Sequence, residues 1–476
     1  MRPLFIAGQR VETTDTRPNI NPSNLDDVID HYAQAGVSET QSAIAAAKDA
    51  FATWSLSGVQ QRHDILKKTG DEILARKDEI GELLSREEGK IRAEGVAETI
   101  RAAQIFHFFA GEALRLSGEV LPSVRPGIGV EITREPLGVV GLITPWNFPI
   151  AIPVWKIAPA ICYGNTVVFK PAELVPGCAW EIVDILHRAG LPDGVLNLVI
   201  GRGSVVGQTI VESPDVDAIS FTGSVGTGAR IAESSLVHMR RLQLEMGGKN
   251  PLVVLDDADL DVAVDSALNG AFFSTGQRCT ASSRLIVTEG IHGAFVERLA
   301  EKMRGLVVDD ALKSGTQIGP VVDENQLSQD TRYIEIARSQ GGNLRCGGET
   351  LRRETRGYFL SPALITDTDR NMRINKEEVF GPVASVIRVR DYDEALDIAN
   401  DTEFGLSAGI CTTSLKYATD FKRKSQAGMV MVNLPTAGVD YHVPFGGRKK
   451  SSYGPREQGS YAKEFHTVVK TAYTAP

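Results

Sequence analysis

The chain has 476 residues, of which 42% are hydrophobic and 23% are charged, and its formal net charge is −9. A chain of this length has room for two or three domains, and its apolar content excludes a largely disordered protein. The mildly acidic balance disfavours nucleic acids and anionic membranes as partners, because both select a basic face.

Five cysteines are spread along the chain, and none of them forms a Cys-x-x-Cys pair. An odd, widely spaced set argues against a disulfide framework and against a zinc site, and it fits a reducing compartment. The first residues carry no long apolar core with a cleavage site, and no apolar run approaches a membrane span. We therefore expect a cytoplasmic protein without a bound metal.

Helical patterns dominate residues 38–116, beginning with a Ser-x-x-Gln start and apolar residues at helical spacing. From Pro136 onward short apolar strands alternate with helices. This alternation predicts a parallel sheet that is covered on both faces and binds ligands at the carboxyl ends of its strands. The expected strands are 138–144, 165–170, 195–200, 217–224 and 241–248, and the expected helices are 150–161, 176–189 and one from Gly226.

A second α/β region is expected from about Asn250 to about residue 435, because the alternation continues there. Two segments fit neither region. Residues 118–137 resemble a hairpin around a Pro-Gly turn, and residues 464–474 resemble a terminal strand. Neither has an apolar core of its own, so we expect them to form an oligomerisation arm.

Cys279 stands out among the five cysteines because it follows a helix-breaking Ser-Thr-Gly and adjoins Arg278. A helix start at this point, or the adjacent positive charge, would favour the nucleophilic thiolate. Cys162, Cys178 and Cys411 lie in or near apolar segments and are interpreted as structural, and Cys346 is expected in a surface loop.

Polar residues follow several predicted strands. Glu245 ends an apolar strand before two glycines, which suits a catalytic base and a solvated strand end equally well. Asn147, held between prolines in TPWNFP, could donate to an oxyanion, although an ordinary turn residue is the simpler interpretation. Lys170 and Glu173, in FKPAE, could bind a ribose. The loop FTGSVGTG has phosphate-binding context, but its glycines read G-x-x-G-x-G, which is not the usual dinucleotide pattern.

Together these segments resemble the aldehyde dehydrogenase superfamily over essentially the whole chain. TPWNFP, FKPAE, FTGS, LEMGGKNP, GQRC, EEVFGPV and PFGG occur in the order and at the separations of that family. The resemblance implies a Rossmann-like NAD(P)-binding domain (1–117 and 138–246), a catalytic α/β domain (247–452) and the arm (118–137 and 453–476).

The resemblance also implies roles for individual residues. Cys279 corresponds to the nucleophile, Asn147 to the oxyanion-hole donor, and Glu245 to the base that activates water. Phe445 corresponds to a wall of the substrate tunnel. The positions that correspond to cofactor contacts are Thr144, Pro145, Trp146, Lys170, Pro171, Glu173, Gly223, Ser224, Gly247, Glu378 and Phe380. Glu173 would repel a 2′-phosphate, which makes NAD the expected cofactor, with NADP as the alternative because Lys170 lies nearby.

The neighbourhoods of Cys279 and of residues 446–456 look most like the branch that oxidises 2-oxoglutarate semialdehyde. Succinate semialdehyde, glutarate semialdehyde or a broad range of aldehydes are the alternatives. Arg278 or Arg284 could anchor a substrate carboxylate, although both could equally bind backbone or neighbouring acids. Ser452, where glycine is common, and Pro455 depart from the usual pattern.

Two further functions remain open. A CoA-acylating enzyme is disfavoured because that subclass generally lacks the base that Glu245 provides. A non-catalytic protein of the same fold would be expected to have lost Cys279, Glu245 or Asn147. We expect a homodimer or a homotetramer, and no nucleic-acid or membrane partner.

Overall fold

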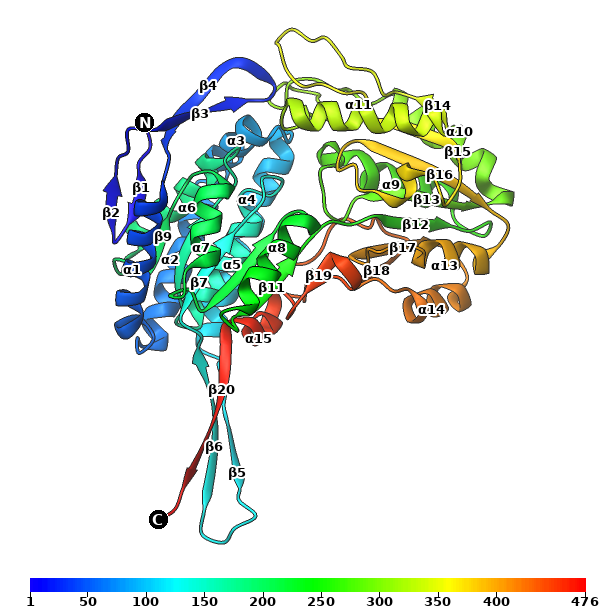
Figure 1. The fold of residues 1–476 in the computed structure, drawn as a ribbon. Helices are drawn as coiled ribbons and strands as arrows, with labels where there is room; N and C mark the ends of the chain where they lie inside the picture. The colour runs from blue at the N-terminus through cyan, green and yellow to red at the C-terminus, as the bar shows by residue number, and fades with distance from the viewer.

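The computed structural model describes residues 1–476 and contains four β-sheets. Figure 1 shows two α/β units side by side and a narrow arm that projects from the first unit and carries the C-terminus. The α/β fold with two separate, largely parallel sheets that the strand–helix alternation predicts is therefore confirmed.

The first sheet has eight strands in the order β19-β11-β10-β7-β8-β9-β1-β2, and the five strands from β11 to β9 are parallel. Their side chains are almost all buried, as expected for strands that are covered on both faces. The strands are β1 Leu4–Ile6, β2 Gln9–Val11, β7 Val139–Ile143, β8 Thr166–Lys170, β9 Leu196–Leu198, β10 Ala218–Thr222, β11 Arg241–Glu245 and β19 Ser452–Tyr453.

The helices around this sheet share one apolar core of 66 buried residues with it. The helical expectation for residues 38–116 is confirmed as four successive helices. The helices are α1 Val37–Trp54, α2 Val59–Ala75, α3 Lys77–Glu88, α4 Arg92–Ala113, α5 Ala151–Cys162, α6 Pro176–Ala189, α7 Gln208–Glu212 and α8 Val225–Leu236, with a π-helix at Gly203–Gly207.

The second sheet has seven strands in the order β14-β15-β16-β13-β12-β17-β18, of which only β14 is antiparallel to its neighbour. The strands are β12 Asn250–Val254, β13 Ser282–Thr288, β14 Asn343–Cys346, β15 Ala363–Thr368, β16 Val383–Val389, β17 Ser407–Cys411 and β18 Met429–Val432. The helices are α9 Leu260–Phe272, α10 Glu289–Arg304, α11 Glu324–Ser339, α12 Arg373–Lys376, α13 Tyr392–Asn400 and α14 Leu415–Lys424.

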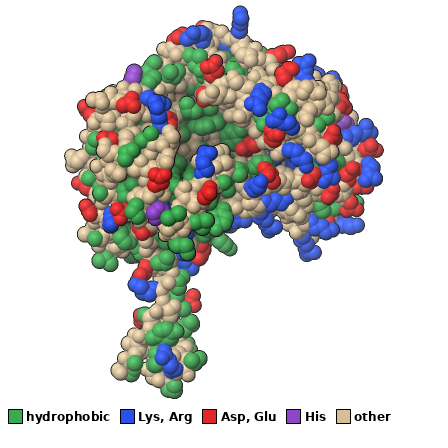
Figure 2. All heavy atoms as spheres, viewed as in Figure 1, with side chains coloured by type: hydrophobic (Ala, Val, Ile, Leu, Met, Phe, Trp, Pro, Cys, Tyr) green, Lys and Arg blue, Asp and Glu red, His purple; other side chains and the backbone are tan.

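The arm is a three-stranded antiparallel sheet of β5 Glu119–Pro122, β6 Gly129–Pro136 and β20 Thr467–Thr474, in the order β20-β6-β5. The terminal strand expected at 464–474 is shorter, because residues Lys463–His466 form a helical turn, α15, that buries Phe465. Figure 2 shows hydrophobic side chains gathered on the projecting arm. Val120 is 80% exposed and Val469 is 58% exposed.

One local feature was not predicted from the sequence, and another differs from the expectation. The residues before Val37 form four short strands, including the hairpin of β3 Thr16–Asn21 and β4 Asn24–Ala33. Cys346 does not lie in a surface loop, because it ends the edge strand β14 and its sulfur contacts that of Met303. No helix combines the length and the apolar character that a membrane span requires.

The carboxyl ends of the parallel strands define where a site is to be sought. β7, β8, β10 and β11 end at Ile143, Lys170, Thr222 and Glu245. Because these strands are parallel neighbours, their ends lie along one edge of the first sheet. The polar residues that follow them in the sequence are therefore brought together.

Asn165 ties the root of the arm to the first sheet. It is fully buried, and its Oδ1 accepts hydrogen bonds from the backbone N–H groups of Leu137 and Gly138 at 2.7 and 3.2 Å. Its Nδ2 donates to the backbone oxygen of His466 at 2.9 Å. One amide thus joins the start of β7 to the segment that precedes β20.

We expect Asn165→Ala to lower the free energy of unfolding by about 2–3 kcal/mol, because it leaves buried backbone groups without partners. Urea or thermal denaturation measures the change. The control is Asn343→Ala on the exposed edge strand β14, which should change stability by less than about 0.5 kcal/mol. Equal stability of the two variants would contradict the role given to Asn165.

Candidate active site

Cys279 lies in a turn between α9 and β13 whose backbone is unusual. Ser274, Thr275 and Gly276 have φ angles of 52°, 56° and 64°, so three successive residues adopt the left-handed region. A Cβ at Gly276 would lie 2.2 Å from the backbone oxygen of Gly381, which excludes a side chain there. The contacts around the turn must offset this strain.

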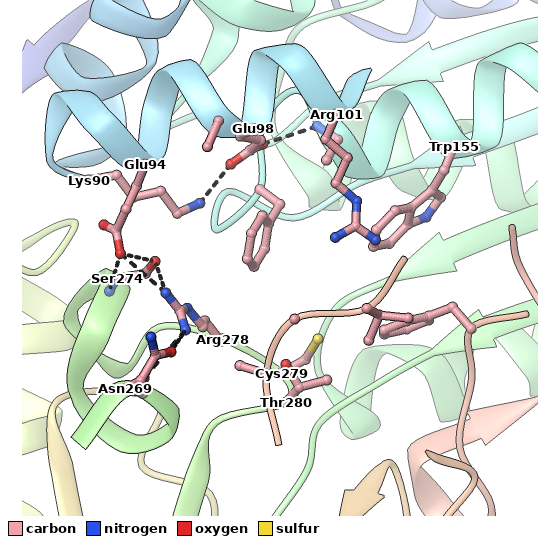
Figure 3. Close-up of a pocket in the computed structure, with 17 residues that line it drawn as sticks. Lys90, Glu94, Glu98, Arg101, Trp155, Asn269, Ser274, Arg278, Cys279 and Thr280 are labelled. Atoms are coloured by element: carbon pink, nitrogen blue, oxygen red, sulfur yellow. Dashed lines mark hydrogen bonds and ion pairs between the residues drawn. The ribbon is translucent and has the colours of Figure 1, made fainter. Parts of the chain in front are cut away.

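Glu94 of α4 holds the turn in place. Its Oε1 accepts hydrogen bonds from the backbone N–H of Ser274 at 3.0 Å and from the Ser274 hydroxyl at 2.9 Å. The same oxygen lies 3.2 Å from Nη2 of Arg278. One carboxylate therefore fixes both the strained turn and the arginine that precedes Cys279, as Figure 3 shows.

A cavity of about 340 Å³ opens onto the sulfur of Cys279. It lies between α4, α5 and the loops around residues 279 and 438, and its size suits a small molecule. Arg278 and Phe445 both line it, as does Trp155, whose ring packs 5.3 Å from that of Phe445. Arg278 and Phe445, which were both expected to contact the substrate, thus line the same cavity as the Cys279 thiol.

The resting thiol is protonated at neutral pH. Burial, followed by the charges of Glu245 and Glu378, raises the pKa of Cys279 to about 12. No helix begins at Cys279, and the Arg278 guanidinium is paired with Glu94. This corrects the expectation that a helix start or the adjacent arginine stabilises a thiolate, and deprotonation must accompany the chemistry.

Asn147 lies against the same turn. Its Nδ2 donates to the backbone oxygen of Gln277 at 2.9 Å, and its own backbone oxygen accepts from Lys90 Nζ. An amide nitrogen carries two hydrogens, so the bond to Gln277 fixes the side chain and leaves the second hydrogen free. The amide is therefore held within the segment that presents Cys279, where a developing oxyanion needs a donor.

Glu245 is the last residue of β11, and it pairs directly with Ser452 of β19. Its Oε2 accepts a hydrogen bond of 2.5 Å from the Ser452 hydroxyl, which in turn accepts one of 2.6 Å from the backbone N–H of Gly447. Because the Ser452 oxygen already accepts from Gly447, its own proton points at Glu245. The serine at a position where glycine is common therefore orients the carboxylate.

The pKa of Glu245 lies well above its usual range. Burial is the main cause, and the charge of Glu457 adds to it, whereas Ser452, Lys156 and Arg456 act in the opposite direction. Lys156 and Glu457 form a fully buried ion pair next to this network. A carboxyl whose pKa is raised is a stronger proton acceptor once ionised than an ordinary carboxylate, which suits a general base.

Lys170 and Glu173 follow β8 at the sheet edge. Lys170 lines a second cavity of about 560 Å³, which also borders the π-helix before α7 and the first turns of α8. Burial lowers its pKa, and its Nζ donates to the backbone oxygen of Pro171. Glu173 accepts from the backbone N–H of Gly203 at 3.2 Å and pairs with Arg17 at 3.0 Å.

The loop after β10 leads into the N-terminus of α8. Ser224 caps this helix, and its Oγ accepts from the backbone N–H of Thr227. The first N–H groups of a helix attract phosphate, and Gly223 precedes them without a side chain. Thr144, after β7, is buried with an unpartnered hydroxyl, so the same edge also offers a free polar group.

The remaining expected cofactor contacts follow β7, β8 and β11 or precede β16. Glu378 accepts a hydrogen bond of 2.8 Å from the backbone N–H of Gly248, and a Cβ at Gly247 would lie 2.3 Å from its Oε2. Trp146 and Phe380 meet edge to face at 5.5 Å. Pro145 and Pro171 lie at the ends of β7 and β8.

Arg284 does not belong to this site. It is fully buried in β13, and its guanidinium donates to the backbone oxygens of Lys249, Ile398 and Ala399 at 3.0 Å each. These backbone groups use its donors, and it lines no part of the cavity at Cys279. This geometry corrects the expectation that Arg284 anchors a substrate carboxylate.

Sequence reasoning missed the charged face that α4 and the preceding loop present to the cavity. Glu94, Glu98 and Arg101 line it together with Lys90. Their spacing of four and then three residues places the three helical side chains on one face of α4. A charged stripe on a helix usually faces solvent, which is why this signal alone does not predict a site.

Comparisons with known proteins agree with this geometry. Residues 10–472 match the family model described as "Aldehyde dehydrogenase family". An alpha-ketoglutaric semialdehyde dehydrogenase of Bacillus subtilis is 44% identical over 99% of this chain and 98% of the relative. An alpha-ketoglutarate semialdehyde dehydrogenase of Haloferax volcanii is 43% identical over 98% of each. The crystal structure of betaine aldehyde dehydrogenase from Staphylococcus aureus in complex with NAD+ has a TM-score of 0.97 and 33% identity, covering 100% of this chain and 95% of that one.

Ser452→Ala tests the orientation of Glu245. The hydroxyl lowers the pKa of this carboxyl, so its loss should raise that pKa and shift the acid limb of acyl-enzyme hydrolysis to higher pH. We expect the hydrolysis rate at pH 7 to fall about tenfold, the value of one hydrogen bond to a charged group. The pH dependence of steady p-nitrophenyl acetate turnover measures this shift.

The initial burst of p-nitrophenol reports on Cys279 and should keep its amplitude in Ser452→Ala. The control is Ser460→Ala, since Ser460 is exposed. An unchanged acid limb in Ser452→Ala would show that the hydroxyl does not govern the base.

Proposed function

This chain belongs to the aldehyde dehydrogenase family, and we propose that it oxidises 2-oxoglutarate semialdehyde (2,5-dioxopentanoate) to 2-oxoglutarate with NAD. The observation that carries this proposal is the charge of the cavity beside Cys279. Three cationic side chains but only two carboxylates line it, namely Lys90, Arg101, Arg278, Glu94 and Glu98. A net positive cavity favours an aldehyde with one carboxylate.

The first chemical step forms a bond between the Cys279 sulfur and the aldehyde carbon. The thiol proton leaves, and the carbonyl oxygen becomes an alkoxide that the Asn147 amide can stabilise. Removing one such donor typically costs about 3–4 kcal/mol in the transition state. The fixed position of Asn147 against Gln277 supports this role.

The second step releases the acid. After the former aldehyde carbon has lost its hydride, its double bond to oxygen forms again, and the carbon, still bonded to the Cys279 sulfur, is a thioester. Glu245 takes a proton from water, the resulting hydroxide adds to the thioester carbon, and the carbon–sulfur bond breaks to give the carboxylate and the thiol. The raised pKa of Glu245, which makes its carboxylate a stronger base than an ordinary one, supports this role.

NAD supplies the hydride acceptor when it is bound. Lys170 and Glu173 would contact its adenosine ribose, the α8 N-terminus with Gly223 and Ser224 its pyrophosphate, and Glu378 its second ribose. Glu173 disfavours a 2′-phosphate, although its ion pair with Arg17 reduces that repulsion. NAD is therefore the proposed cofactor and NADP the alternative.

A panel of aldehydes of matched length tests the substrate charge. We expect kcat/KM for 2-oxoglutarate semialdehyde to exceed that for pentanal by at least about tenfold, since charge-assisted hydrogen bonds contribute about 1.5–3 kcal/mol. Succinate and glutarate semialdehydes should follow it, and the cationic 4-aminobutanal should be the poorest substrate. NADH absorbance measures each rate with NAD and with NADP.

The same assay separates the other functions. Dependence of the rate on added CoA would identify an acylating enzyme, and no NADH with any aldehyde would identify a non-catalytic protein. A preference for pentanal or 4-aminobutanal over the semialdehydes would refute the proposed substrate.

We also propose that the chain assembles as a homodimer or a homotetramer through the arm. The strands β20 and β5 are open edges of a small sheet, and their exposed apolar side chains would be covered by a second copy. The proposed domain limits are the ones that the family resemblance implies. The proposed location is the cytoplasm, which the five free cysteines support.

Removing residues 468–476 should lower the mass of the assembly to that of a smaller species, because it deletes most of β20 but keeps the buried Phe465 and His466. Light scattering after size-exclusion chromatography measures the mass. An unchanged mass would refute assembly through β20, and the retained α15 keeps the core intact for that comparison.

A further inference from the structure

Arg101 is the one cationic side chain of the substrate cavity that has no acidic partner. Lys90 Nζ lies 2.8 Å from Glu98 Oε2, and Arg278 is paired with Glu94. Arg101 forms no ion pair, and its only hydrogen bond runs from Nη2 to Oε1 of Gln458 at 3.2 Å. Its Nε is buried without an acceptor.

This unpartnered guanidinium points at the reaction centre. Figure 3 shows Arg101 projecting from α4 beside Trp155, into the space above Cys279. Gln458, which contacts it, is fully buried, and the amide nitrogen of Gln458 also lacks an acceptor. Two neighbouring side chains, Arg101 and Gln458, therefore each have a buried nitrogen donor without a hydrogen-bond acceptor.

Arg101 is half-buried and its Nε is fully buried, and a charge that is partly removed from water without an ion-pair partner is costly, so such a group calls for an explanation. The apolar walls around it, Trp155 and Phe445, cannot accept its hydrogen bonds. Burial lowers the pKa of Arg101, whereas the more distant charges of Glu98 and Asp440 act in the opposite direction without forming an ion pair with it. An anion that enters the cavity would remove this cost on binding.

We propose that Arg101 is the specificity-determining residue that binds the carboxylate of the aldehyde substrate. The inference rests on the proposed function and names the group that selects the substrate. The planar guanidinium offers its two terminal nitrogens, of which Nη2 bonds Gln458 and Nη1 makes no hydrogen bond, as a fork that matches a carboxylate. The aldehyde at the other end of the substrate would then lie at Cys279, within the same cavity.

Arg278 is the competing anchor, because it also lines the cavity. Its guanidinium already donates hydrogen bonds to Glu94, to the Ser274 hydroxyl and to the backbone and side-chain oxygens of Asn269. A substrate carboxylate at Arg278 would have to displace Glu94, which also holds the strained turn. Arg101 can bind the same group without breaking an ion pair.

The test compares Arg101→Gln and Arg101→Lys with Arg92→Gln. Arg92 lies on the same helix but is more than half exposed and pairs with Glu82, which makes it a matched control. For each protein, kcat/KM is measured with 2-oxoglutarate semialdehyde and with pentanal. We expect Arg101→Gln to lose about 30- to 100-fold on the semialdehyde and less than about threefold on pentanal, as for one lost charge-assisted fork.

Arg101→Lys should recover part of the semialdehyde rate, because it keeps the charge but loses the fork. Arg92→Gln should match the wild type with both aldehydes. In a separate measurement, the product 2-oxoglutarate should raise the unfolding temperature of the wild type more than that of Arg101→Gln or Arg101→Lys. The unfolding temperature reports binding of the carboxylate even if one variant is poorly active.

The outcomes separate this inference from the proposed function. A wild type without preference for the semialdehyde over pentanal refutes the proposed function. A wild type with that preference, which Arg101→Gln retains, refutes the role of Arg101 alone. Equal losses of Arg101→Gln on both aldehydes would also overturn it, because they would indicate a structural role.

Discussion

The left-handed turn over Ser274, Thr275 and Gly276 is the constraint on which the rest of the site depends. It directs the chain so that Cys279 faces a cavity and so that the backbone oxygen of Gln277 meets the Asn147 amide. Such a turn persists only where surrounding contacts over-determine it. Glu94 supplies them from α4, in the first unit of the fold. The nucleophile on the loop before β13 is thus positioned by a helix that lies about 180 residues earlier in the chain.

Charge pairing then decides which side chains are free to act. The carboxylate of Glu94 is shared between the turn and Arg278, and that of Glu98 binds Lys90. These pairs leave Arg101 as the one cation of the cavity without an ion-pair partner. Glu245 makes different contacts, since it is buried against Ser452 and near the Lys156–Glu457 pair and is not among the residues that line the cavity. Nucleophile and base are nevertheless coupled, because the charge of Glu245 raises the pKa of the Cys279 thiol.

Much of this site could be predicted from the sequence because parallel strands bring their ends to one edge. Asn147 and Gly223 follow such strands, and Lys170 and Glu245 end them, so the strand pattern alone places the four residues together. The prediction for Arg284 was wrong because nearness to Cys279 along the chain does not determine where a side chain points. Strand β13 places the Arg284 side chain in the core. Arg101 was missed for a different reason. Its importance lies in the absence of an acidic partner, and only tertiary packing determines which acids are already paired.

The same reasoning explains why one fold can serve aldehydes of opposite charge. The backbone of this chain matches that of an enzyme named for betaine aldehyde, a cation, at a TM-score of 0.97. The turn, the thiol and the strand-end residues perform the chemistry at the aldehyde carbon and are indifferent to the far end of the substrate. That end meets the face of α4, where the balance of three cations against two carboxylates is set by single side chains. Because one unpaired charge changes the binding free energy by more than about 1.5 kcal/mol, a substitution at position 101 can change the preferred substrate without altering the reaction.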